Sequence, residues 1–111
     1  NVIWQGDAND AILRCFAHCA SPPFVLNLTG GETLSVRAVA ERFGRLLGKA
    51  PQFVGNEQPT ALLSNAARYH AMMGPPRVDL DRLVAWTAHW VKIGGESLDK
   101  PTHYEARDGK F

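Results

Sequence analysis

Residues 24–49, FVLNLTGGETLSVRAVAERFGRLLGK, carry a strand signal, a turn signal and a helix signal in succession. Residues 24–28 are mostly apolar and precede Gly30 and Gly31, which is typical of a buried strand that ends in a turn. Ser35 is placed to cap the helix. The apolar residues of this helix recur with a helical period: Val36, Val39, Ala40, Phe43, Leu46 and Leu47. A strand followed by an amphipathic helix is half of a parallel α/β unit, so we expect the helix to pack on a sheet.

The totals limit the class of protein. The 111 residues suffice for one domain, and 45% hydrophobic with 21% charged residues favours a globular chain over a disordered or membrane-spanning one. The net charge is +1 and the basic residues form no stripe, so we expect neither nucleic acid nor membrane as a partner. Two cysteines, Cys15 and Cys19, are too few for a disulfide scaffold and favour a cytoplasmic setting. Asn1 in place of Met, with no targeting segment, indicates that the chain begins inside a larger protein.

The remaining elements are mostly helical. Asp7 is expected to cap a first helix that ends before the prolines at 22 and 23. Residues 51–55 suggest a second short strand, residues 56–60 an exposed loop, and residues 61–73 a helix, at least from Asn65 onward. A last helix is expected from Asp79, ending at Gly94 and Gly95.

Two short strands form a poor sheet for three or four amphipathic helices. We therefore expect most of the sheet to belong to a part that is missing, rather than an unusually helical small domain.

Motifs for phosphate and metal binding are incomplete. Gly30 and Gly31 lack the rest of a G-x-G-x-x-G turn, so we interpret them as a plain turn that uses positive φ. Residues 44–50 are one residue too short for a P-loop and follow a helix instead of preceding one. Cys15, His18 and Cys19 share a helix face but lack a fourth ligand, so we expect no metal site. No catalytic residue is predicted, because the histidines are isolated and neither tyrosine is followed four residues later by lysine.

Several segments, in order, resemble the C-terminal part of the extended short-chain dehydrogenase/reductases, the NAD-dependent epimerase/dehydratase family. Residues 4–11 (WQGDANDA) are similar to the family's HV-x-D-x-x-x-A helix start, and residues 24–32 (FVLNLTGGE) to its vyNvgsge strand and turn. Residues 63–76 look like its D-x-S-K-A-x-x-x-L-G-w-x-P stretch, and the helix from Asp79 like its closing helix. The likeness covers residues 4–95.

This resemblance implies an α/β fold, namely the C-terminal lobe of a Rossmann-type extended short-chain dehydrogenase, mostly helical with two or three short strands. Residues 1–95 would form the substrate-binding lobe and residues 96–111 an irregular tail. The partner would be the N-terminal Rossmann lobe, which in the family binds NAD or NADP and carries the Tyr-xxx-Lys catalytic residues. This chain would then be inactive alone, and in the whole enzyme it would shape specificity for a small-molecule substrate such as a sugar or nucleotide sugar.

The resemblance also suggests which residues face the substrate. Trp4 stands where family members often have histidine, and Glu57 and Gln58 lie in a loop that often grips a nucleotide diphosphate. We expect these three residues to bind substrate and none to bind cofactor. Because Glu57 would repel phosphate, a less charged sugar, a steroid-like compound or another carbonyl compound remains open.

A second hypothesis is a free-standing protein-interaction module without enzymatic activity. A glycine-rich G-x-x-G-x-x-G turn and a Tyr-xxx-Lys pair upstream in the parent gene would decide for the enzyme. A third hypothesis, a winged-helix DNA-binding protein, is disfavoured because no helix has a basic face.

Overall fold

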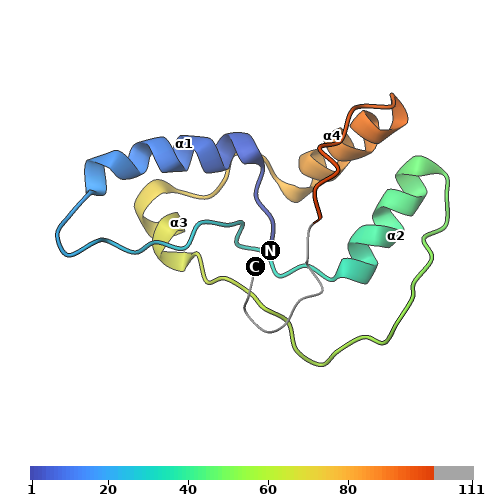
Figure 1. Ribbon diagram of the computed structural model, residues 1–111, viewed down its shortest axis with the longest axis horizontal. Coiled ribbons are helices and arrows are strands. Elements are labelled where there is room, and N and C mark those ends of the chain that lie inside the picture. The colour runs from blue at the N-terminus through green and yellow to red at the C-terminus, as the bar shows by residue number, and fades with distance from the viewer. Residues whose placement is uncertain (102–111) are drawn as a thin grey trace.

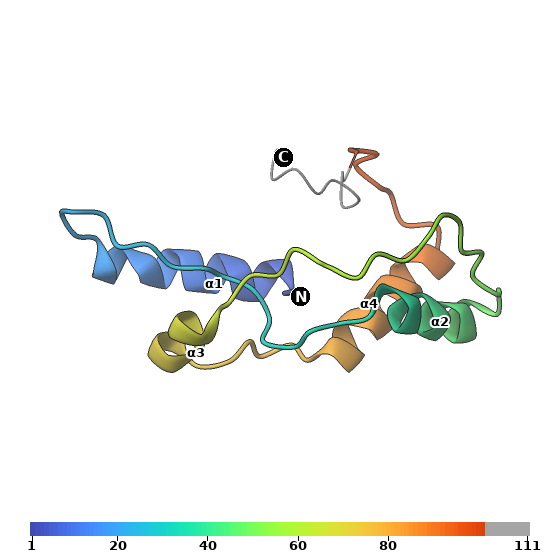
Figure 2. The same cartoon turned by 90° about the horizontal axis from the view of Figure 1, so that it is seen from below.

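The computed structural model describes residues 1–101, which form four α-helices joined by extended segments without regular secondary structure (Figure 1). A short 3₁₀ helix, Phe16–His18, directly follows the first helix. The α-helices are α1 (Gln5–Cys15), α2 (Val36–Leu47), α3 (Ala67–Met73) and α4 (Leu80–Lys92). Helices α1 and α3 lie at one end of the molecule, and α2 and α4 at the other (Figures 1 and 2).

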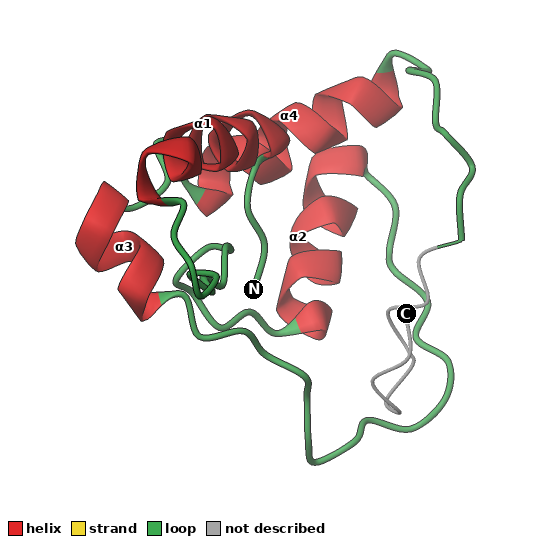
Figure 3. Ribbon diagram, turned by 60° about the vertical axis from the view of Figure 1, so that its left-hand side comes forward, coloured by secondary structure: helices red, strands yellow, loops and turns green. Residues whose placement is uncertain are grey.

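The expected α/β fold, with two or three short strands, is wrong, because residues 1–101 contain no strand (Figure 3). Residues 24–28 do alternate as a strand would, since Phe24, Leu26 and Leu28 are half-buried while the residues between them are exposed. No backbone–backbone hydrogen bond involves residues 24–28 in the described part of the chain. A β-strand requires backbone hydrogen bonds to a neighbouring strand. The second expected strand, at residues 51–55, does not provide them and is exposed to solvent, with Val54 95% exposed.

The cap predicted for α2 is confirmed, and α4 begins next to Asp79 as expected, with that residue as its N-cap. The Ser35 hydroxyl accepts a hydrogen bond from the Ala38 N–H at 3.3 Å, and the Asp79 carboxylate accepts one from the Arg82 N–H at 2.8 Å. These bonds satisfy amides of the first turn that have no partner within the helix. Asp7, by contrast, is not a cap, because α1 begins two residues earlier with Trp4 at the N-cap.

Helix α2 packs against α4, and not on a sheet as expected. Val84 and Ala88 of α4 are buried, and Arg42 of α2 pairs with Asp81 at the start of α4 at 2.6 Å. No residue of α2 itself is buried, and Val36 at its start is 73% exposed. The apolar stripe of α2 is therefore only partly covered by the described residues.

An apolar cluster joins α1 and α3. Its buried members are Ala11, Ala66 and Tyr69, and four half-buried residues pack against them: Ile3, Leu26, Leu28 and Met73. The start of α1 meets α4 where the Trp4 ring lies edge to face with the Trp86 ring, with their centroids 5.4 Å apart. Residues before α1, after α1 and before α3 are thus brought together by one small core.

The chain as a whole is open. Its exposed area is 9001 Å², against about 6,000 Å² for a compact protein of this mass. Its radius of gyration is 16.3 Å, against about 13 Å for a compact domain of this length. Only five hydrophobic residues among those described are buried. Large apolar faces therefore remain in contact with water.

Two further expectations concern the C-terminal tail and membrane-spanning helices, and both are assessed only over residues 1–101. Of the tail expected at 96–111, residues 102–111 lie outside them. Within residues 1–101, no helix combines the length and apolar character that crossing a bilayer requires.

Candidate functional site

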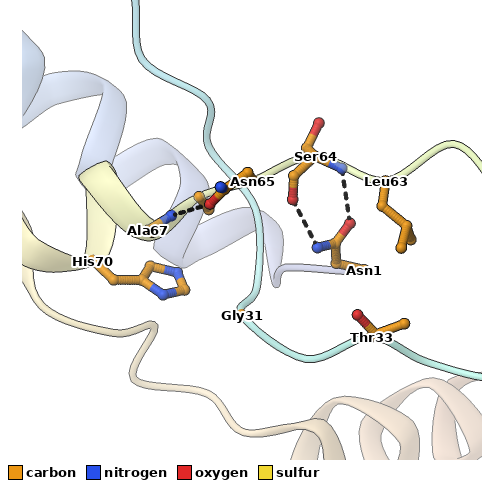
Figure 4. Close-up of a pocket in the computed structure, with 9 residues that line it drawn as sticks. Asn1, Gly31, Thr33, Leu63, Ser64, Asn65, Ala67 and His70 are labelled. Atoms are coloured by element: carbon orange, nitrogen blue, oxygen red, sulfur yellow. Dashed lines mark hydrogen bonds between the residues drawn. The ribbon is translucent and has the colours of Figure 1, made fainter.

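A pocket of about 400 Å³ lies where the N-terminus, the segment after Gly30 and the start of α3 meet (Figure 4). Its lining residues come from segments that are far apart in the sequence: Asn1, Gly31, Thr33, Leu63, Ser64, Asn65, Ala66, Ala67 and His70. The volume is at the lower end of the range for small-molecule sites, about 300–1,000 Å³. We take this pocket as the candidate functional site.

Side-chain amides hold the walls of the pocket together in place of a β-ladder. The Asn1 amide donates to the Ser64 carbonyl oxygen at 2.9 Å and accepts from the Ser64 N–H at 3.4 Å. The Asn27 amide donates to the Asn65 carbonyl oxygen at 3.2 Å. Since each asparagine reaches across to a different chain segment, these bonds fix the pocket where backbone pairing does not.

His70 is oriented by the carbonyl of Thr29, whose oxygen lies 3.0 Å from His70 Nε2. A carbonyl oxygen only accepts hydrogen bonds, so Nε2 carries the proton and donates it. In the neutral ring, Nδ1 is then a free acceptor, and Figure 4 shows the ring directed toward the space beside Gly31. The pocket thus presents one defined acceptor.

The glycines before α2 are required for close approach. A Cβ on Gly31 would lie 2.9 Å from His70 Cε1 and 3.2 Å from His70 Nδ1, and a Cβ on Gly30 would collide with the Val2 carbonyl oxygen. Neither glycine is among the residues with positive φ. The interpretation as a turn that needs positive φ is therefore wrong, because the demand comes from packing.

The remaining polar side chains of the pocket, those of Asn1, Thr33, Ser64 and Asn65, are uncharged. Asn65 uses its amide oxygen to accept from the Ala67 N–H at 3.0 Å, which leaves its NH₂ group as a donor. The Thr33 hydroxyl lies on the opposite wall (Figure 4). Leu63, Ala66 and Ala67 add apolar surface. No carboxylate, lysine, arginine or cysteine side chain is among the described lining residues, so His70 is the one histidine or charged-type side chain that they include.

The three residues expected to bind substrate lie elsewhere. Trp4 packs on Trp86, and none of Trp4, Glu57 and Gln58 lines the pocket. Glu57 forms an ion pair with Arg37 at 2.6 Å, while Gln58 is exposed. Because Arg37 offsets the charge of Glu57, the predicted repulsion of phosphate by this loop is weaker than the sequence suggested.

The sequence pattern does not identify the pocket residues, and His70 has no chemically matched neighbour near it in the sequence. One signal was present: Asn27 interrupts an otherwise apolar run, and its side chain crosses to Asn65. A polar residue inside an expected buried strand needs a partner. It therefore marked a second segment nearby, without identifying which.

Tyr69 lies beside the pocket, in the core, and is 3% exposed. Burial raises its pKa above the ordinary value of 10.0, and the negative charge of Asp7 adds to the rise, while Arg14 opposes it. Burial disfavours the phenolate because that form loses its hydration. The Tyr69 hydroxyl is therefore held in its neutral form.

This pKa shift predicts a loss of stability in alkali. Below pH 10 both folded and unfolded chains keep the proton; above it the unfolded chain releases the proton first, so stability falls as pH rises toward the folded pKa. The Tyr69→Phe variant should lack this component. Urea unfolding of both chains on either side of pH 10 checks it, and an identical pH dependence would contradict the assignment.

The described residues contain no group of three or more His, Cys, Asp or Glu side chains that is placed to hold a metal ion.

Comparison with known proteins identifies no relative: no family model, no curated protein sequence and no solved structure matches this chain.

Proposed function

We propose that this chain is the substrate-binding portion of an NAD(P)-dependent sugar epimerase or dehydratase, or of a related reductase. It would not be catalytic alone, because the nucleotide and the reacting tyrosine and lysine would be held by a Rossmann lobe that packs on it. The substrate would be a small molecule, bound between the two lobes. Trp4, Glu57 and Gln58 are the residues we propose to face it.

The observation that carries the proposal is the incomplete core. Helix α2 has an apolar stripe but no buried residue, and residues 24–28 alternate as a strand without a ladder. Val25, on the outer side of that segment, is 76% exposed. Apolar faces and unpaired backbone of this kind are stable when a second body covers them. We propose that this second body is a nucleotide-binding lobe, because several segments of the chain resemble the epimerase/dehydratase family in the same order.

Calorimetry on two polypeptides tests the proposal. The product of the whole reading frame that contains this chain should bind NAD⁺ or NADP⁺ with saturable heat, whereas the 111-residue chain should give none. Absence of nucleotide binding by the longer product would contradict the proposed enzyme class. Tight binding by the 111-residue chain alone would contradict the assignment of roles to the two lobes.

One surface favours the second candidate, a protein-interaction module. Ile12, Leu13 and Phe16 near the end of α1 are 54%, 67% and 72% exposed and lie close together in the sequence. An exposed apolar patch on a helix is typical of a protein–protein contact. The same calorimetry separates the candidates, because a module has no reason to bind nucleotide in either polypeptide.

A further inference from the structure

We propose that the outer face of α4 binds an acidic, proline-rich peptide segment of a partner protein. Around the helix this face lies opposite the buried Val84 and Ala88. Its exposed members recur at helical spacing: Arg82, Trp86, His89, Trp90 and the cap residue Ile93. None of the residues proposed to face the substrate belongs to it, so the inference goes beyond the proposed function.

The two tryptophans of this face are exposed but fixed in position. Trp86 is 46% exposed, and its ring lies edge to face with that of Trp4. Trp90 is 53% exposed; its indole N–H donates to the Glu96 carbonyl oxygen at 3.0 Å, and a Cβ on Gly95 would collide with its ring. A side chain that is already ordered loses little conformational entropy when a ligand covers it. The rings therefore form a preorganised surface of the residue type that dominates binding hot spots.

The polar groups of the face favour a ligand that accepts hydrogen bonds and donates few. The Trp86 indole and the Arg82 guanidinium can only donate, and neither has an acceptor within residues 1–101. A polyproline II segment presents unpaired carbonyl oxygens, and its prolines have no N–H. Its rings also pack well on aromatic side chains. A peptide of other composition would bring amide N–H groups for which the face offers only His89.

The charges around the face favour acidic residues beside the prolines. The carboxylates of α4 are committed, one as the helix cap and the other, Asp81, to Arg42 at 2.6 Å. Arg82 has no carboxylate partner among the described residues. Lys92 and Glu96, both exposed near the other end of the face, carry opposite charges. The unpaired guanidinium therefore sets the sign, and a carboxylate of the partner complements it.

Two other occupants fit less well. A second copy of this chain would offer the diprolines at 22–23 and 75–76, but neither adjoins an acidic residue, and the second precedes Arg77. A lipid surface takes up apolar side chains that enter it freely, whereas about half of Trp86 and of Trp90 is covered by the chain itself.

Tryptophan fluorescence tests the inference, because the three tryptophans of the chain all lie in this face or against it. A short acetylated peptide of prolines interrupted by glutamates should shift the emission saturably to shorter wavelength. The same peptide with glycine and serine in place of proline should bind at least about tenfold more weakly, since it is flexible and carries amide N–H groups. No saturable shift, or equal binding of the two peptides, would overturn the proposal.

The same signal detects the other occupants. A shift that grows with protein concentration in the absence of peptide would assign the face to a second copy. Binding to phosphatidylglycerol vesicles without binding to the proline peptide would assign it to a membrane. Either result would overturn the proposal.

Variants of Trp86 locate the binding. Trp86→Ala should weaken it at least about 30-fold, as expected of a hot spot. Trp86→Phe keeps a ring, removes the indole N–H and should weaken it about 2- to 12-fold, the equivalent of one hydrogen bond. Trp4 and Trp90 still report the titration. Circular dichroism checks folding, and unchanged binding in a folded Trp86→Phe chain would contradict the assignment.

Arg82→Gln tests the charge, with Arg45→Gln as the matched control at an exposed position of α2. Loss of the Arg82 charge should weaken binding of the acidic peptide about 2- to 5-fold, as for an exposed ion pair, and the control should not. Equal effects of the two variants would refute the acidic specificity. None of these results bears on the nucleotide titration that tests the proposed enzyme class.

Discussion

The Tyr69→Ala chain is expected to be largely unfolded at 25 °C. Tyr69 is 3% exposed and is the only large side chain among the buried hydrophobic residues of the described chain. Truncating a buried aromatic residue to alanine costs about 3–5 kcal/mol, and small domains are stable by only about 5–15 kcal/mol. This chain belongs at the low end of that range because its core is small. Urea unfolding followed by circular dichroism measures the loss.

Val36→Ala is the control for this prediction. Val36 is 73% exposed at the start of α2, so its truncation should change the free energy of unfolding by no more than about 0.5 kcal/mol. If Tyr69→Ala were as stable as Val36→Ala, the cluster of α1 and α3 would not be the main source of stability.

Asp7→Ala should be the next most damaging change. The Asp7 carboxylate is 6% exposed and accepts a hydrogen bond from the Val78 N–H at 2.9 Å, which ties the segment before α4 to the first turn of α1. Hydrogen bonds to charged groups contribute about 1.5–3 kcal/mol, and the loss of this one also leaves the partly buried Val78 N–H unpaired. The free energy of unfolding in urea should fall by that amount.

Asp10→Ala is the matched control on the same helix. Asp10 pairs with Arg14 at 3.6 Å and with Arg77 at 3.9 Å, and all three side chains are at least 44% exposed. Exposed ion pairs contribute about 0–1 kcal/mol. Equal losses for the two variants would mean that the Asp7 bond to Val78 does not hold the α1 end of the molecule to α4.

Local signals in the sequence predicted the helices well. Ser35 caps α2 as expected, because a cap depends on residues within one turn of it. Helix α4 also begins next to Asp79 as expected. Gly48 ends α2 with a φ of 67°, which glycine adopts readily. What the apolar stripe of α2 would pack against was not predictable, since periodicity identifies a face but not its neighbour. The structure places α4 there, not a sheet.

The strand prediction at residues 24–28 failed for a similar reason. The alternation of Phe24, Leu26 and Leu28 is present, but a strand also needs a second chain segment in register. The pocket could not be predicted from the sequence either, because it depends on contacts between distant segments. Asn1 and Ser64, which are hydrogen-bonded, are 63 positions apart, and no local pattern connects them. The charge of the loop at Glu57 was also mispredicted from the sequence, because the ion pair with Arg37 offsets the negative charge of Glu57.

Amide hydrogen exchange on the isolated chain tests most directly the claim that its core is incomplete without a second body. Residues 24–28 donate no backbone hydrogen bond to another backbone group, so their amides should exchange close to the unfolded rate while those of α1 are protected. Protection of residues 24–28 as strong as that of α1 would mean that the chain already pairs this segment by itself, and it would contradict the account.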